Sequence, residues 1–236
     1  MGRIKIVNGR VITPFRIIEN GTVLIEDGRI SSVGQGNIDY PGARLIDAQN
    51  NYVSPGFIDM HTHGGGGHDF MDGTVEAFLG AAKTHALHGT TALVPTTLTT
   101  ETVDLLQTFS VYSQAKKENT EGAQFLGLHL EGPYFSMNQK GAQDPRYIRL
   151  PRNEEYKSIL SHSPDIIRWS AAPELDGAME FGRFLAQKGI LPSVAHSDAT
   201  SEEVAEALEN SFTHLTHLYS GMSGVMRSSR LPRQVY

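Results

Sequence analysis

The chain has 236 residues, of which 39% are hydrophobic, with 20 basic and 26 acidic side chains and a formal net charge of −6. This balance is typical of a globular protein with one large or two small domains, and it argues against intrinsic disorder and a nucleic-acid-binding surface. The absence of cysteine excludes disulfides, cysteine-ligated zinc and a thiol nucleophile. Ten histidines therefore remain, with the carboxylates, as candidates for metal chemistry.

The sequence shows no targeting or membrane segment. Its first residues lack the apolar run of a signal peptide, and no later stretch reaches the roughly 18 apolar residues of a membrane span. We expect a cytoplasmic protein with neither a membrane nor a nucleic acid as its partner.

Residues 1–53 are expected to form part of a small β-sandwich domain. The turn dipeptides Asn8-Gly9, Asn20-Gly21 and Asp27-Gly28 separate short apolar segments, a pattern typical of β-hairpins. No apolar face of helical period appears before residue 72, so a domain boundary is expected near residue 53.

Residues 54–226 show apolar strands that alternate with helical segments, as in βα units on a parallel sheet. Strands are expected over residues 52–61, 91–96, 124–131, 166–172, 191–196 and 212–218. Helices are expected over residues 74–88, 100–117, 153–161 and 176–188, and a last helix begins after Thr200, which forms a capping box with Glu203.

The fold class expected from this pattern is α/β, an incomplete (β/α)₈ barrel with its first six βα units. A closed barrel takes about 250 residues, more than the sequence offers after residue 53. Residues 227–236 have neither an apolar period nor a helix cap and are expected to be an atypical tail. An open sheet edge and an uncovered core face would favour a homo-oligomer.

Metal-competent side chains stand at four of the predicted strand ends. His61 and His63 are two residues apart and face the same side of a strand, while Glu131, His196 and His217 each end or follow another strand. A single histidine at a strand end is more often a hydrogen-bonded loop residue than a metal ligand. Metal-competent side chains at the carboxyl ends of four barrel strands, however, indicate an active site. The sequence predicts a centre for one or two divalent ions, Zn²⁺ first, with Fe²⁺, Mn²⁺ or Co²⁺ as alternatives.

Two other histidines lie close to these positions in the sequence. His129 shares a face with Glu131 and is expected to support a ligand rather than to be one. His214, three residues before His217, is expected to be a packed side chain.

Several segments together resemble one known family. Residues 55–63 (PGFIDMHTH) resemble the signature that opens the metal-dependent amidohydrolase superfamily, and residues 25–30 (IEDGRI) resemble its N-terminal β-sandwich. Within it, HLEGPYF (129–135), KGAQ (140–143), APE (172–174), AHSDAT (195–200) and THLY (216–219) resemble the N-acetylglucosamine-6-phosphate deacetylases.

This resemblance implies hydrolysis of the N-acetyl amide of an amino-sugar phosphate, N-acetylglucosamine-6-phosphate, to glucosamine-6-phosphate and acetate. It implies that Glu131, His196 and His217 are the main metal ligands and that His61 and His63 are a second-metal pair. The residues that it assigns to substrate binding are Ala142, Gln143, Ser220, Gly221 and, for the phosphate, Arg227.

The resemblance places the general acid/base aspartate on the eighth barrel strand, beyond residue 236, so no catalytic residue is assigned. Because such a group contributes about 10²–10⁴-fold, the chain is expected to be a slow deacetylase. Two alternatives stay open. One is a catalytically silent fragment that binds metal or sugar phosphate. The other is an amidohydrolase acting on another amide, although relatives that cleave cyclic amides or aminopurines lack HLEGP and KGAQ segments.

Overall fold

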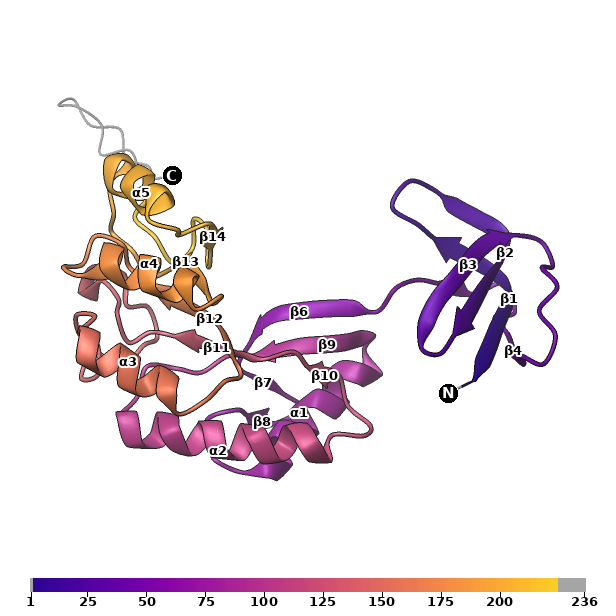
Figure 1. The fold of residues 1–236 in the computed structure, drawn as a ribbon, viewed down its shortest axis with the longest axis horizontal. Coiled ribbons are helices and arrows are strands. Elements are labelled where there is room, and N and C mark those ends of the chain that lie inside the picture. Colours follow the sequence, from indigo (N-terminus) through magenta and orange to yellow (C-terminus); the bar gives the residue numbers. More distant parts are fainter. Residues whose placement is uncertain (1, 225–236) are drawn as a thin grey trace. The chain divides into compact units, whose positions relative to one another are not determined.

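The computed structural model describes residues 2–224, and the chain divides between Gly56 and Phe57 into two compact units (Figure 1). The predicted tail over residues 227–236, with Arg227, lies outside the described residues. Over residues 2–224, no helix combines the length and apolar character needed to cross a membrane.

The N-terminal unit is a five-stranded sheet. Its strands are β1 (Arg3–Ile12), β2 (Ile17–Glu26), β3 (Arg29–Gln35), β4 (Arg44–Asp47) and β5 (Tyr52–Val53). Their order is β3-β2-β1-β4, and β5 also pairs with β1. Strand β2 is antiparallel to β1 and β3, whereas β4 and β5 run parallel to β1. Val11, Val23 and Leu24 are buried in this unit.

One of the three predicted turn dipeptides connects two strands, and the other two do not. Asp27-Gly28 joins β2 to β3, but Asn8-Gly9 and Asn20-Gly21 lie inside β1 and β2, where the pairing register shifts. Asn8 and Asn20 have left-handed φ values of 55° and 50°. An Asn-Gly pair suits that backbone in a bulge as well as in a chain reversal, so the prediction of turns at these two places was wrong.

The C-terminal unit alternates parallel strands with helices. The strands are β6 (Phe57–Thr62), β9 (Thr90–Pro95), β10 (Gln124–Phe125), β11 (Leu128–Glu131), β12 (Ile166–Ala171), β13 (Leu191–Val194) and β14 (His214–Leu215). The helices are α1 (Val75–Leu87), α2 (Thr102–Glu118), α3 (Asn153–Ser161), α4 (Ala178–Gln187) and α5 (Ser201–Glu209). A short antiparallel hairpin, β7 (Gly64–Gly65) and β8 (His68–Asp69), follows β6, and a 3₁₀ turn (Met137–Gln139) follows β11.

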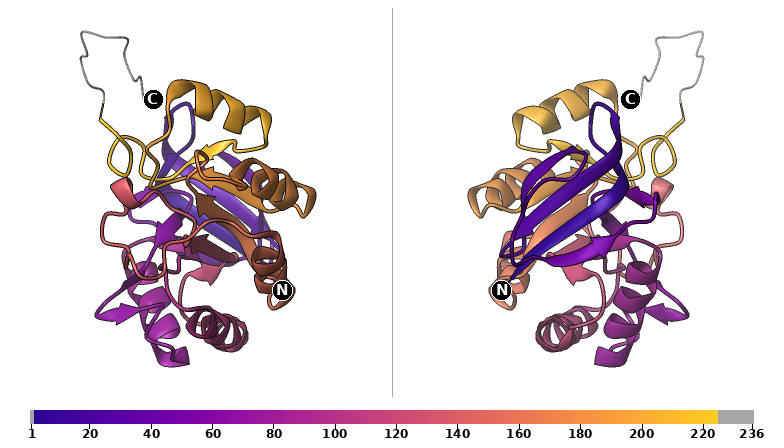
Figure 2. Two further views of the ribbon diagram at one scale, coloured as in Figure 1. Left: turned by 90° about the vertical axis from the view of Figure 1, so that its left-hand side faces the viewer. Right: turned by 90° about the vertical axis from the view of Figure 1, so that its right-hand side faces the viewer.

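Neighbouring strands in this unit follow the order of the chain. The parallel sheets β6-β9-β10 and β11-β12-β13-β14 meet where Thr96, after β9, bridges to His129 of β11. Strands in chain order with a helix after most of them are the arrangement of a (β/α)₈ barrel, which confirms the predicted fold class. Figure 1 shows the helices along the outer side of these strands, and Figure 2 shows α4 and α5 side by side on that surface.

The main hydrophobic core lies between the strands and the helices. Trp169 of β12 is fully buried, meets Phe181 of α4 edge-on at 5.1 Å between ring centroids, and stacks on Tyr134 at 5.6 Å. Tyr112 of α2 packs against Phe125 of β10 with centroids 5.8 Å apart. These aromatic contacts fix the outer face of the strands, so the strand ends have defined positions.

Candidate metal centre

One buried carboxylate lies at the centre of the predicted site. Glu131 ends β11, and its side chain is 1% exposed. Its Oε1 lies 2.8 Å from Nε2 of His217 and 3.4 Å from Nε2 of His196. His61 Nε2 lies 3.6 Å from the same oxygen, and His63 Nε2 lies 3.2 Å from Oε2. The structure therefore brings together all five residues that were predicted as metal ligands.

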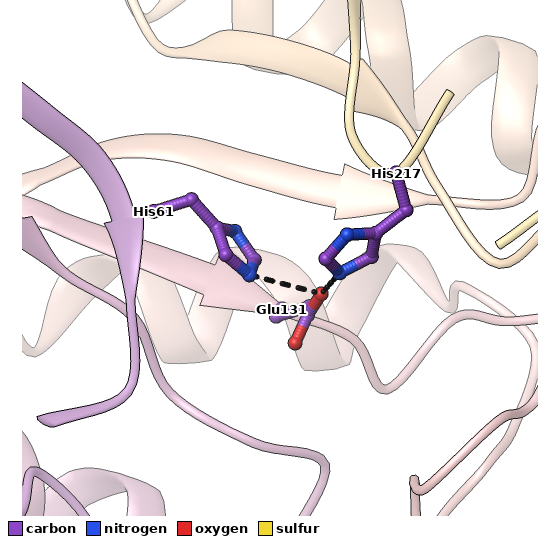
Figure 3. Close-up of side chains that lie close together, drawn as sticks. All are labelled: His61, Glu131 and His217. Carbon is purple, nitrogen blue, oxygen red and sulfur yellow. Dashed lines mark hydrogen bonds and ion pairs between the residues drawn. The ribbon is translucent and has the colours of Figure 1, made fainter. Parts of the chain in front are cut away.

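The ends of the parallel strands position these side chains. His61 belongs to β6 and His63 follows it, so their spacing of two residues puts both rings on the Glu131 side. His196 and His217 follow β13 and β14 and have left-handed φ values of 47° and 58°, so the chain turns sharply where each ring leaves the strand. Figure 3 shows the imidazoles of His61 and His217 directed at Glu131 from either side.

Backbone carbonyls select the protonation of two of the rings. Nδ1 of His63 lies 3.1 Å from the carbonyl oxygen of Thr96, and Nδ1 of His196 lies 2.9 Å from that of Gln139. A carbonyl only accepts, so both Nδ1 atoms carry the proton and donate it. In the neutral ring Nε2 then carries the lone pair that a metal would take, whereas in the protonated ring Nε2 donates to Glu131.

The imidazoles keep Glu131 ionised. Burial works to raise the pKa of this carboxyl, but hydrogen bonds from His196, His217 and His63 hold that pKa far below its usual value. Burial also lowers the pKa of His61 to about 4, against the raising effect of Glu131. At neutral pH the centre therefore holds a buried anion beside a neutral His61 ring.

The predicted substrate-binding residues fall into two groups. Gln143 is 4% exposed; its Nε2 donates to Oε2 of Glu131 at 2.9 Å, and its Oε1 accepts from the Thr99 amide at 2.8 Å. Its amide is thus engaged in holding the carboxylate, while its neighbour Ala142 is exposed.

The second group follows β14. The amides of Ser220 and Gly221 donate to the carbonyl of His217 at 3.0 and 2.8 Å, which makes a tight turn beside that ring. Arg227, assigned to the phosphate, lies outside the described residues.

The donor set fits a divalent cation. His61, Glu131 and His217 each offer a ligand atom, and these atoms all lie within 4.8 Å of one another. Nε2 of His61 is buried and has no hydrogen-bond partner in the described part of the chain. Imidazole nitrogens around a carboxylate, with no sulfur ligand, suit Zn²⁺ and neighbouring divalent metals.

Behind the carboxylate, a chain of buried polar groups runs through the strand interior. Nε2 of His129 lies 2.6 Å from Ser170 Oγ, which lies 3.3 Å from Thr216 Oγ1. Thr216 Oγ1 is 2.8 Å from Ser193 Oγ, and this oxygen is 2.9 Å from Nδ1 of His214. His129, expected to support a ligand, and His214, expected to be packed, are the two ends of this chain.

Sequence reasoning missed Arg168, which is 5% exposed on β12. Its Nη2 lies 2.6 Å from Nδ1 of His129 and 3.2 Å from Nδ1 of His61. The available signal was a charged residue inside the apolar run of residues 166–172, two positions before Ser170 and therefore on the same face.

Comparison with known proteins identifies the family. Residues 52–231 match the Amidohydrolase family. The chain is 34% identical over 218 residues to N-acetylglucosamine-6-phosphate deacetylase of Bacillus subtilis (strain 168), a match that covers 90% of this chain and 55% of that relative. It is 30% identical to N-acetylgalactosamine-6-phosphate deacetylase of Escherichia coli O157:H7, over 92% of this chain and 56% of that one.

A solved structure agrees with these relatives. The crystal structure of N-acetyl-D-glucosamine-6-phosphate deacetylase from Mycobacterium smegmatis superposes with a TM-score of 0.85 and 30% identity, over 95% of this chain and 58% of that one. The chain spans about half the length of the curated relatives that it matches. The resemblance predicted from the sequence is thereby confirmed, and the family implies a divalent metal. This chain belongs to the amidohydrolase family.

Proposed function

We propose that this protein hydrolyses the N-acetyl amide of N-acetylglucosamine-6-phosphate, releasing acetate and glucosamine-6-phosphate. The observation that carries the proposal is the buried Glu131 carboxylate, which four imidazole Nε2 atoms approach at 2.8–3.6 Å. The similarity to relatives named as deacetylases of amino-sugar 6-phosphates supports the choice of substrate.

Under this proposal the centre binds Zn²⁺ in preference to other divalent ions. Glu131, His196 and His217 bind the principal ion, and His61 with His63 provides for a second. A bound divalent cation supplies polarisation of the amide carbonyl and a lowered pKa for the attacking water. Gln143 keeps the carboxylate from rotating, since its amide donates to Oε2 and is itself anchored on Thr99.

The sugar phosphate is proposed to bind above His196 and His217. Ala142 is exposed and follows Gly141, where an added Cβ would lie 3.5 Å from the His196 ring. The exposed Ser220 belongs to the turn that folds back on the His217 carbonyl. Contacts from these loops, with Gly221 beside them and Arg227 at the phosphate, would place the acetyl group at the centre.

Acetate release tests this function. The chain is dialysed against a chelator, reloaded with Zn²⁺ and given N-acetylglucosamine-6-phosphate, and a Glu131→Gln variant of the same size is the matched control. We expect metal-dependent acetate release by the wild type and none by the variant. N-acetylgalactosamine-6-phosphate, the substrate named for one relative, is run in parallel, and faster turnover of it would reassign the substrate. No release from either sugar, with Zn²⁺ bound, would leave the silent fragment as the correct alternative.

We also propose that the chain self-associates through β6. Ile58 and Met60, two residues apart on this outermost strand, are 61% and 55% exposed, and the neighbouring Phe57 is 69% exposed. Exposed apolar side chains on an edge strand favour association with another chain. Sedimentation velocity of the wild type is expected to show a dimer or larger species. Ile58→Glu should shift it toward monomer, whereas Phe15→Ser, at an exposed site of the other unit, should not. A monomeric wild type contradicts the proposal.

A further inference from the structure

Arg168 is a buried cation at the rear of the metal centre. It is 5% exposed, and its guanidinium lies behind the His61 ring, on the side opposite the Nε2 atom that faces Glu131. Its hydrogen-bond partners in the described part of the chain are two imidazoles, His129 and His61, and its Nε has none. A guanidinium donates only and stays charged, so a full positive charge sits against the ligands of a cation site.

A buried charge of this kind requires a compensating charge. Glu131 is a buried carboxylate, with a side chain that is 1% exposed. The His61 ring lies between the two groups, with Nδ1 3.2 Å from Nη2 of Arg168 and Nε2 3.6 Å from Oε1 of Glu131. The guanidinium and the carboxylate can therefore offset each other across this ring.

We propose that Arg168 is the internal counter-ion of Glu131 in the cation-free protein and that it competes electrostatically with the divalent cation. The inference deepens the proposed function, because it concerns the same metal centre. Arg168 stabilises the cation-free state and weakens cation binding, which makes the metal exchangeable. Its role is therefore regulatory for metal loading rather than catalytic.

A positioning role for Arg168 would have the opposite sign. If its main effect were to orient His129 and through it His61, its removal would weaken metal binding by about 10–100-fold, as for other residues that support metal ligands. As a counter-ion, its removal relieves repulsion between like charges in a low-dielectric interior, and tightens binding. The sign of the change in affinity therefore separates the two roles.

The experiment is calorimetric titration of Zn²⁺ into the chelator-dialysed 236-residue chain. Arg168→Met removes the charge and keeps an unbranched side chain, and we expect at least about tenfold tighter binding. Arg168→Lys keeps the charge but loses the planar fork, and we expect affinity within about threefold of the wild type. Weaker or unchanged binding by Arg168→Met, or a 10–100-fold loss in Arg168→Lys, would overturn the proposal.

A matched control removes another arginine. Arg149 is paired with Glu155 at 2.5 Å. Arg149→Met should lower the melting temperature without changing the affinity for Zn²⁺. If Arg168→Met does not fold without the cation, Arg168→Lys decides the question alone.

A cation-free double-mutant cycle keeps this inference separate from the proposed function. Melting temperatures of the wild type, Arg168→Met, Glu131→Gln and the double variant are measured in chelator. Each single variant should melt lower than the wild type, and the double variant should recover most of that loss, because neither charge is then left unpaired. Additive losses would show that Arg168 does not compensate Glu131, whether or not the chain binds Zn²⁺ or releases acetate.

Discussion

The two sides of β12 are both buried, but by different means. Trp169 faces the helices and packs against Phe181 and Tyr134, whereas Arg168 and Ser170, one residue to either side, enter a network of hydrogen bonds behind Glu131. The outer face stabilises the fold through apolar packing, and the inner face holds charges that only a fixed geometry can balance. Substitutions on the two faces should therefore affect different measurements.

The largest effect is expected on the inner face, from Glu131→Ala. This variant removes the one carboxylate that the four imidazoles share. Loss of Zn²⁺ affinity should exceed the roughly 100-fold that removal of a supporting residue causes. Calorimetric titration measures it, and retention of affinity within tenfold would show that the ion binds elsewhere.

On the outer face, Phe181→Ala is expected to lower the free energy of unfolding by about 3–5 kcal/mol. Phe181 is fully buried and contacts Trp169, Tyr134 and Tyr156. Urea unfolding of the cation-free chain measures the loss. Leu87→Ala, at a side chain 77% exposed, is the control and should change less than about 0.5 kcal/mol. If Phe181→Ala lost Zn²⁺ affinity instead of stability, the two faces would not be separable.

The sequence predicts the outer face and the strand ends better than the strand interior. Apolar runs and helical periods are local patterns, so the barrel strands and the helix after Thr200 followed from them. His61, His63 and Glu131 could be placed together because parallel strands end at one edge. The direction of the Arg168 side chain could not be predicted. The alternation of side chains along a strand shows which residues share a face, but not which face points into the barrel.

Loop residues were harder to interpret for a related reason. Gln143 was assigned to the substrate by its motif, yet its buried amide bridges the Thr99 amide and the Glu131 carboxylate. That contact joins residues far apart in sequence, and no local period marks it. Asn8-Gly9 likewise shows that an Asn-Gly pair indicates a left-handed backbone conformation but does not say whether that conformation lies in a turn or in a bulge within a strand.

A smaller effect on the inner face is expected from Gln143→Leu. The substitution keeps most of the volume but removes the donor that holds Oε2 of Glu131. Zn²⁺ affinity should fall by about 10–100-fold, less than in Glu131→Ala. Gln143→Glu, which places a second carboxylate beside the first, should lose the same hydrogen bond and serves as the matched comparison. An unchanged affinity in Gln143→Leu would show that the carboxylate does not need this support.

The smallest effect is expected from a helix cap away from both faces. Thr200 accepts from the Glu203 amide, and the Glu203 carboxylate accepts from the Thr200 amide, which confirms the predicted capping box. Thr200→Ala should lower the free energy of unfolding by about 1 kcal/mol, and Thr200→Ser by much less. Urea unfolding checks both. A loss above about 2 kcal/mol would mean that this cap also supports the nearby His196 loop.

Anomalous scattering at the zinc edge, from crystals of this chain grown with Zn²⁺, tests the metal centre most directly. We expect a peak about 2.0–2.2 Å from an Oε atom of Glu131 and from Nε2 atoms of the surrounding histidines, His196 and His217 among them. A peak confined to surface histidines, with Glu131 bound to no ion, would contradict the proposed centre.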